Sequence, residues 1–129
     1  MSQSKDYSQI IRVDEEIIAK LKELNEPDEE IPFFDGLIHL YCQEAPMALN
    51  KLDKAMNQQD PLAVVHFSHK LKGLSRNLGL RRMAEICATI EHGTETLNTI
   101  EQRDLFEASR VELDQVIVAL SQYLKPEAA

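Results

Sequence analysis

The sequence predicts an all-α fold: an antiparallel up-down four-helix bundle with an additional short N-terminal helix. Apolar residues recur three and four positions apart along most of the 129 residues, which is the spacing of amphipathic helices. No segment shows the alternation of apolar and polar residues that marks a half-buried strand. The helical patterns are long and the segments between them are short, as antiparallel neighbours in a bundle require. The length fits one domain, residues 1–129.

The N-terminal part precedes the bundle. Residues 1–8 are polar and are expected to be flexible. A helix is expected over residues 11–24, because apolar residues share one face and acidic residues stand early, where the helix dipole favours anions. The acidic, proline-containing segment 25–32 ends this helix. The helix is expected to cover one end of a bundle formed by residues 33–125.

The first bundle helix is expected over residues 33–56, where apolar residues follow the helical spacing. Pro46 lies inside this pattern. Since proline removes one backbone hydrogen bond and clashes with the preceding turn, a kink or a short break is expected near residues 42–45. A polar turn follows, in which Asp60 is a good N-cap and Pro61 suits the first position of the next helix.

Three further helices complete the bundle. The second is expected over residues 61–78, with Gly79 ending it in a left-handed conformation. The third is expected over residues 80–97 and the fourth over residues 105–124, with residues 101–104 as a short connection. In the second bundle helix, the residues expected to face the core form one stripe: Val64, Phe67, Leu71, Leu74 and Leu78.

The opposite face of the second bundle helix carries a distinctive row of residues. His69 projects about 180° from the centre of the apolar stripe. Lys72 and Gly73 follow three and four residues later, which places them on the same solvent face, and Arg76 follows one turn further on. The helix would therefore present to water a histidine, a lysine, a bare patch of backbone and an arginine.

This row suits phosphoryl chemistry on the histidine. An exposed imidazole is mostly neutral at pH 7, so one ring nitrogen keeps a lone pair that can attack phosphorus. Lys72 is close enough to offset the charge on the phosphoryl oxygens. Gly73 costs roughly 0.5–1 kcal/mol in a helix interior, and the missing side chain would let a partner approach the ring. The alternative interpretation is a surface histidine beside a surface lysine, with no role for the glycine.

The motif and its flanking helices resemble the histidine-containing phosphotransfer (HPt) domain family. The residues that carry this resemblance are His-Lys-Leu-Lys-Gly at 69–73, Asn-Leu-Gly at 77–79 and the Ile-Glu pair at 90–91. Two positions depart from the family pattern. Ser68 stands where the family usually has alanine, and Leu74 stands where it usually has serine or alanine. The resemblance covers roughly residues 33–125.

The resemblance implies a phosphotransfer protein of a two-component phosphorelay. His69 would accept a phosphoryl group from the aspartyl phosphate of a response-regulator receiver domain and pass it to another receiver. Receiver domains, a hybrid sensor kinase, or both would be the partners. The Mg²⁺ of such reactions would belong to the receiver, so no cofactor is expected on this chain. The competing interpretation is an HPt-like docking module that carries no phosphate, although an intact motif at residues 69–73 weighs against it.

Basic residues around the histidine suggest how a partner docks. Residues 61–84 contain no acidic residue, and this window predicts an electropositive face that steers an acidic or phosphorylated partner. By resemblance, Glu91 is a further candidate near the histidine ring, and the alternative is a solvated helix end. The docking candidates in the basic window are Lys70, Arg76, Arg81 and Arg82.

Composition and motifs exclude several other functions. The net charge of −8 argues against binding to nucleic acid or to an anionic membrane. No segment approaches the roughly 18 consecutive apolar residues of a transmembrane helix. Cys42 and Cys87 are interpreted as free thiols in a reducing compartment, and we therefore expect a cytoplasmic protein. A monomer is expected as well. The chain offers a nucleophile but no nucleotide site or activating groups, so it is expected to be a phosphocarrier and not an enzyme.

A pair of histidines on the second bundle helix raises the alternative of a metal site. His66 and His69 are three residues apart, a spacing that some helical metal sites use. Their directions differ by about 60° around the helix, and no carboxylate lies in the same window. No metal site is therefore expected.

Overall fold

The computed structural model describes residues 6–124, and all regular structure within them is helical. The predicted all-α class is therefore confirmed. In chain order, the elements are the 3₁₀ helix η1 (Tyr7–Gln9) and the α-helices α1 (Glu15–Lys22), α2 (Phe33–Asn57), α3 (Pro61–Asn77), α4 (Arg81–Gly93) and α5 (Thr99–Ser121).

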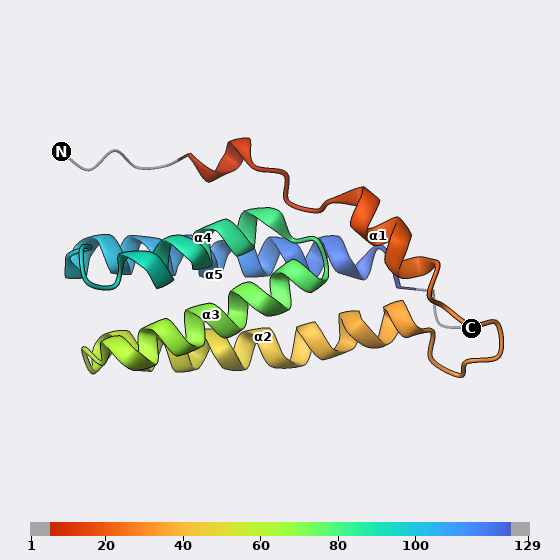
Figure 1. The fold of residues 1–129 in the computed structure, drawn as a ribbon, viewed down its shortest axis with the longest axis horizontal. Coiled ribbons are helices and arrows are strands. Elements are labelled where there is room, and N and C mark those ends of the chain that lie inside the picture. The colour runs from red at the N-terminus through yellow and green to blue at the C-terminus, as the bar shows by residue number, and fades with distance from the viewer. Residues whose placement is uncertain (1–5, 125–129) are drawn as a thin grey trace.

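Helices α2 to α5 form an antiparallel up-down bundle (Figure 1). Each helix packs on its two neighbours in a closed ring: α2 on α3, α3 on α4, α4 on α5, and α5 back on α2. Consequently α3 and α5 lie diagonally across the core, to which all four helices contribute buried apolar residues. The predicted four-helix bundle with a short N-terminal helix is confirmed.

The N-terminal segment runs along α4 and ends in α1, at the end of the bundle where α3 turns into α4 (Figure 1). α1 is shorter than the helix predicted over residues 11–24. Asp14 is the N-cap residue of α1, because its side chain accepts a hydrogen bond from the Glu16 N–H at 3.0 Å. Ile11 precedes the helix, and its carbonyl accepts a hydrogen bond from the Arg82 N–H at 3.1 Å.

The part of the chain expected to be flexible lies partly outside the described residues, since residues 1–5 are not described. Of the rest, Tyr7–Gln9 form η1, which packs on α4. The Tyr7 hydroxyl donates a hydrogen bond to the Thr89 hydroxyl at 2.7 Å. These contacts hold the segment against the bundle.

Helix α2 continues through Pro46, and the break expected near residues 42–45 does not occur. Pro46 removes one backbone donor, but the residues around it are held by the core. Ala45, Ala48 and Leu49 are all at most 5% exposed. Tertiary packing therefore offsets the local preference of the proline for a helix end.

The ends of α3 follow the sequence prediction. The side chain of Asp60 accepts a hydrogen bond from the Ala63 N–H at 3.2 Å, and Pro61 occupies the first turn. Gly79 adopts a positive φ of 68° just after the helix, as predicted. A β-carbon on Gly79 would also lie 3.0 Å from the Cβ of Ile17 in α1, so both conformation and space favour glycine here.

The connection between α4 and α5 differs from the prediction. α4 ends at Gly93, short of the expected helix end, and α5 begins at Thr99, so residues 101–104 are helical and not a connection. A capping box starts α5. The Asn98 side chain accepts a hydrogen bond from the Glu101 N–H at 2.8 Å, and the Glu101 side chain accepts one from the Asn98 N–H at 3.0 Å. Asparagine three residues before glutamate is a sequence signal that would have placed this helix start.

The core-facing side of α3 is rotated by about 50° from the predicted stripe, counted at about 100° per residue. Three of the five predicted positions are buried as expected. However, Phe67 and Leu74 are only partly buried at the edge of the core, whereas Ser68 and Ser75 are 0% exposed. The face of α3 that meets the core therefore includes serines that a hydrophobic pattern passes over.

Both serines are tolerated in the core because their hydroxyls are hydrogen-bonded. The Ser68 hydroxyl donates to the Val64 carbonyl at 2.6 Å, one turn back in the same helix. The Ser75 hydroxyl lies 3.0 Å from the hydroxyl of Tyr41 on α2. A small side chain with a satisfied hydroxyl costs little to bury.

Candidate functional site

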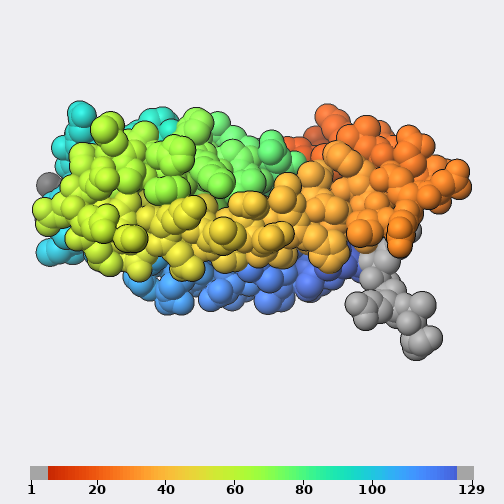
Figure 2. Space-filling model, turned by 90° about the horizontal axis from the view of Figure 1, so that it is seen from below, coloured from red at the N-terminus to blue at the C-terminus, as the bar shows by residue number. Residues whose placement is uncertain are grey.

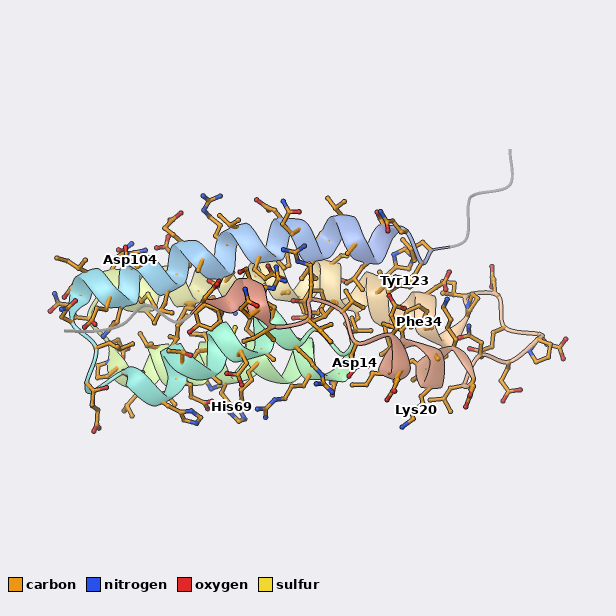
Figure 3. The ribbon with its side chains drawn as sticks, turned by 90° about the horizontal axis from the view of Figure 1, so that it is seen from above. Asp14, Lys20, Phe34, His69, Asp104 and Tyr123 are labelled. Atoms are coloured by element: carbon orange, nitrogen blue, oxygen red, sulfur yellow. The ribbon has the colours of Figure 1, made fainter. Side chains whose placement is uncertain are left out.

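His69 lies on α3 at the outer edge of the bundle, where Figure 3 shows it directed away from the core. Its side chain is 67% exposed. The ring is nevertheless held in place, because Nδ1 lies 2.6 Å from Oε2 of Glu91 on α4. The side chain of Glu91 is only 12% exposed, so this carboxylate sits beneath the ring and not in open water.

Lys72 was predicted on the solvent face beside His69, and this prediction is wrong. Lys72 is 8% exposed, and its ammonium group donates a hydrogen bond to Oε1 of Glu91. The physical reason is the rotation of α3, which carries Lys72 from the solvent face into the seam between α3 and α4. One carboxylate therefore binds both the histidine and the lysine, through its two oxygens.

Glu91 is ionised at neutral pH. Partial burial alone would raise the pKa of Glu91, but hydrogen bonds from Lys72 and His69, with the charges of both groups, outweigh burial and lower the pKa below its usual range. A carboxylate accepts hydrogen bonds and donates none. The proton between Nδ1 and Oε2 therefore belongs to the histidine.

This arrangement fixes which nitrogen of His69 can react. With the proton on Nδ1, the neutral ring has its lone pair on Nε2. Nδ1 faces Glu91 inside the seam, so Nε2 is the nitrogen on the exposed side of the ring. If Nε2 bonds to an electrophile while Nδ1 keeps its proton, the ring gains a positive charge that the Glu91 carboxylate can offset.

Gly73 follows on the exposed face of α3. Apart from its two chain neighbours and the nearby backbone of its own helix, a β-carbon on Gly73 would meet no atom within 4 Å. The backbone there is also helical, so neither conformation nor internal packing requires glycine. The open space lies on the solvent side, where a side chain would project toward an approaching partner.

The predicted docking residues divide into two groups. Lys70 is 3.6 Å from Glu44 on α2, and Arg76 is exposed with no carboxylate within 4.0 Å in residues 6–124. Arg81 pairs with Asp14 at 2.6 Å while keeping its side chain 59% exposed. These three lie at the surface.

Arg82 has a different setting. Its guanidinium donates to the Ile10 carbonyl at 2.8 Å and to the Ser8 carbonyl at 3.2 Å, and its side chain is 19% exposed. Arg82 therefore anchors the N-terminal segment and is not presented to a partner. The predicted electropositive face is correspondingly smaller, because Lys72 and Arg82 face inward and Arg81 is paired.

His66 and the two cysteines lie outside this cluster, and His92 lies at its edge. His66 is exposed, with its ring against Phe67 at 4.8 Å between centroids, and His92 is exposed with Nε2 4.0 Å from Oε1 of Glu91. Cys42 and Cys87 are free thiols, and burial raises the pKa of Cys87 to about 12.

Residues 6–124 contain no group of three or more histidine, cysteine or acidic side chains arranged to hold a metal ion. None of the helices in this range is both long and apolar enough to cross a membrane.

The bridging position of Glu91 could have been found from the sequence. His69 and Glu91 are each eleven residues from Leu80, which lies in the turn between α3 and α4. In an antiparallel helix pair, residues equally distant from a short turn come to lie beside each other. Sequence reasoning placed Glu91 near the ring only by resemblance.

The chain belongs to the Hpt domain family, which it matches over residues 36–123. Membership in this family supports a phosphotransfer role in two-component signalling. The chain is similar to multistep phosphorelay regulator 1 of Schizosaccharomyces pombe (strain 972 / ATCC 24843), with 29% identity over 80 residues. That match takes in 62% of this chain and 27% of the yeast protein, so the chain spans about a quarter of its relative's length.

The fold is also shared with a solved structure. The crystal structure of histidine-containing phosphotransfer protein B from Pseudomonas aeruginosa PAO1 superposes with a TM-score of 0.75. The match covers 88% of this chain and 95% of the bacterial protein, at 24% sequence identity. The helical bundle described above is thus the fold of that protein.

Proposed function

We propose that this protein is a phosphocarrier of a two-component phosphorelay and that His69 carries the phosphoryl group. The observation that carries this proposal is an exposed imidazole whose inner nitrogen is hydrogen-bonded to an ionised, largely buried carboxylate. That arrangement leaves the outer nitrogen reactive and the ring oriented. Family membership supports the same reaction class.

In the proposed reaction, the Nε2 lone pair attacks the phosphorus of an aspartyl phosphate on a receiver domain. The Nε2–P bond forms as the bond from phosphorus to the aspartate oxygen breaks, and the carboxylate leaves with the electron pair. Nδ1 keeps its proton, so the phosphorylated ring is cationic and Glu91 offsets its charge. The cationic ring is also the better leaving group when a second receiver aspartate attacks the phosphorus.

Lys72 acts indirectly in this proposal. Its side chain is only 10% exposed and its ammonium group is bound to Glu91, so its proposed role is to hold that carboxylate. By favouring the ionised carboxylate, it keeps Glu91 a hydrogen-bond acceptor for Nδ1. The chain supplies the nucleophile, and the receiver supplies Mg²⁺ and the aspartate. It would therefore act as a carrier and not as an enzyme in its own right.

The proposed docking face for the receiver lies on the exposed sides of α2 and α3, which Figure 2 shows side by side. Exposed apolar side chains lie on both helices: Leu40 and Met47 on α2 are 47% and 49% exposed, and Leu62 on α3 is 82% exposed. The Glu44–Lys70 ion pair joins the two helices between these positions. Exposed apolar side chains together with a surface ion pair are suited to reversible binding of a partner.

The experiment is phosphoryl transfer from phosphorylated receiver domains to the purified protein. The wild type is expected to acquire acid-labile, base-stable label, and His69→Gln is expected to acquire none while keeping its helical circular dichroism. His66→Gln is the matched control, because His66 is exposed on the same helix one turn earlier. Label retained by His69→Gln would refute the proposal.

The same experiment tests the competing function. A docking module that carries no phosphate would bind a receiver or a hybrid sensor kinase, and its affinity would not depend on the phosphorylation of His69. Binding without any label on the wild type would favour the docking module over the phosphocarrier.

A further inference from the structure

A groove of about 390 Å³ lies between α1 and the turn that joins α3 to α4. Ile17 of α1 is partly exposed and forms one wall, and Leu80 and Ala84, which are at most 5% exposed, also line the groove. Arg76, at the end of α3, and Arg81, at the start of α4, line the groove with their basic side chains. Glu85 also lines the groove, which therefore combines an apolar wall from α1 with charged side chains of both signs.

Among the charged groups of this groove, Arg76 is the one left for a partner. Arg81 is bound to Asp14 at 2.6 Å. Glu85, the acidic residue of the lining, already has an interaction of its own. Arg76 is exposed, and within residues 6–124 no carboxylate lies within 4.0 Å of it. A guanidinium in this setting can form a bidentate pair with a carboxylate from outside the chain.

The groove lies close to His69 on the same side of the molecule. Arg76 is seven residues after His69, which is two helical turns, about 10 Å along the axis and about 20° around it. A specific protein interface covers about 800 Å² on each partner, which corresponds to a disc roughly 16 Å in radius. A receiver centred on His69 would therefore extend over Arg76 and the groove.

We propose that the groove is a second docking point for the receiver domain, and that it takes an acidic segment carrying one apolar side chain. The apolar side chain would lie against Ile17 and Ala84, and the neighbouring carboxylate would pair with Arg76. This inference rests on the proposed function. It adds a specificity determinant, because a receiver with a basic residue at the matching position would be repelled by Arg76.

Continuity with the face around His69 favours a receiver over a second copy of this chain. A receiver whose aspartate reaches His69 is already aligned along α3, so occupying the groove requires no separate binding event. A second copy of this chain would bind through the groove only, without a contact at His69. Its binding would then appear as dimerisation that depends on protein concentration.

The test compares Arg76→Glu with Arg76→Lys, using a receiver domain that exchanges label with wild-type His69. Arg76→Glu is expected to raise the Kd for the receiver by about fivefold or more at low salt, with a smaller difference at high salt, because exposed charges are screened. Arg76→Lys is expected to bind more weakly than the wild type and more tightly than Arg76→Glu, because lysine keeps the positive charge but cannot form the bidentate pair. Arg110→Glu is the matched control, since Arg110 is exposed on α5, diagonally across the bundle from α3.

A partner-free reaction separates this inference from the proposed function. Phosphoramidate is the probe, and labelling of Arg76→Glu on His69 is expected to show that this variant keeps a folded bundle and a reactive histidine. An unchanged Kd for Arg76→Glu would overturn the docking inference while leaving the phosphocarrier intact. If the wild-type protein fails to exchange label with any of the receiver domains, the proposed function itself is overturned. Loss of a dimer in sedimentation, with an unchanged Kd for the receiver, would assign the groove to a second copy.

Discussion

Two carboxylates on this bundle have similar partners and different surroundings. Glu91 lies between His69 and Lys72 in the seam of α3 and α4. Glu112 on α5 is 4% exposed and accepts two hydrogen bonds from Arg12, at 2.8 and 3.1 Å, with Arg82 of α4 at 3.9 Å. Each carboxylate thus binds two basic side chains. Both come from α3 at Glu91, whereas at Glu112 one comes from the N-terminal segment and one from α4.

The difference lies in what the basic partners can do. The guanidinium groups around Glu112 are permanently charged and have no lone pair, so that cluster can only hold the N-terminal segment against α4 and α5. The imidazole beside Glu91 is 67% exposed and has a second nitrogen free to react. Of the two clusters, only the one at Glu91 has a partner that is both exposed and able to act as a nucleophile, which is what the proposed reaction requires.

Removing the Glu91 carboxylate should have the largest effect on activity. Glu91→Ala is expected to slow phosphoryl transfer to His69 by about 100-fold, and Glu91→Gln by about tenfold, since a charge-assisted hydrogen bond contributes about 1.5–3 kcal/mol. The measurement is single-turnover transfer from a phosphorylated receiver. Glu112→Gln is the control, and a similar slowing in that variant would remove the distinction between the two carboxylates.

Removing the Glu112 carboxylate should have the largest effect on stability. Glu112→Ala is expected to lower the free energy of unfolding by about 2 kcal/mol, because the guanidinium groups of Arg12 and Arg82 lose their shared partner in a partly enclosed site. Urea unfolding measures the change. Glu107→Ala, on the exposed face of α5, should change stability by less than about 1 kcal/mol. Equal effects of the two substitutions would show that the buried cluster does not hold the segment.

Acid should abolish the stabilising contribution of Glu91. The pKa of Glu91 is lower in the folded chain than its ordinary value of 4.5, so the folded state binds this proton more weakly than the unfolded state. The resulting stability is present above pH 4.5 and is lost as the pH falls through the folded-state pKa. The difference in unfolding free energy between wild type and Glu91→Gln should therefore shrink from neutral pH to well below pH 4.5. A difference that grows in acid would contradict the assigned direction.

The two glycines of the α3 region should respond in opposite ways, with the smallest effects. Gly73→Ala is expected to raise the free energy of unfolding by about 0.5–1 kcal/mol, since alanine favours a helix and the added carbon meets open space. Gly79→Ala is expected to lower it by about 1 kcal/mol or more, because of the positive φ and the contact with Ile17. Thermal unfolding measures both. Gly73→Gln should additionally slow transfer by blocking the receiver, and transfer at the wild-type rate would reject that role.

Much of the fold could be predicted because its signals are local. The start of α3 at Asp60 and Pro61 and its end at Gly79 depend on residues that are adjacent in sequence. The capping box of Asn98 and Glu101 is equally local, although the apolar pattern alone predicts a helix start several residues later. The opposite holds at Pro46. The proline locally favours a helix end, but its buried neighbours keep α2 continuous.

Helical periodicity was enough to predict the bundle and to place His69 and Gly73 on the exposed face of one helix. The inward direction of Lys72, the link from Lys72 through Glu91 to His69, and the anchoring of the N-terminal segment by Arg82 depend on how the helices pack. The reason is physical. Helical periodicity gives the relative directions of residues on one helix, but a rotation of about half a residue step is set by how neighbouring helices pack. Serines with satisfied hydroxyls allowed α3 to adopt that rotation, and the rotation assembled the site.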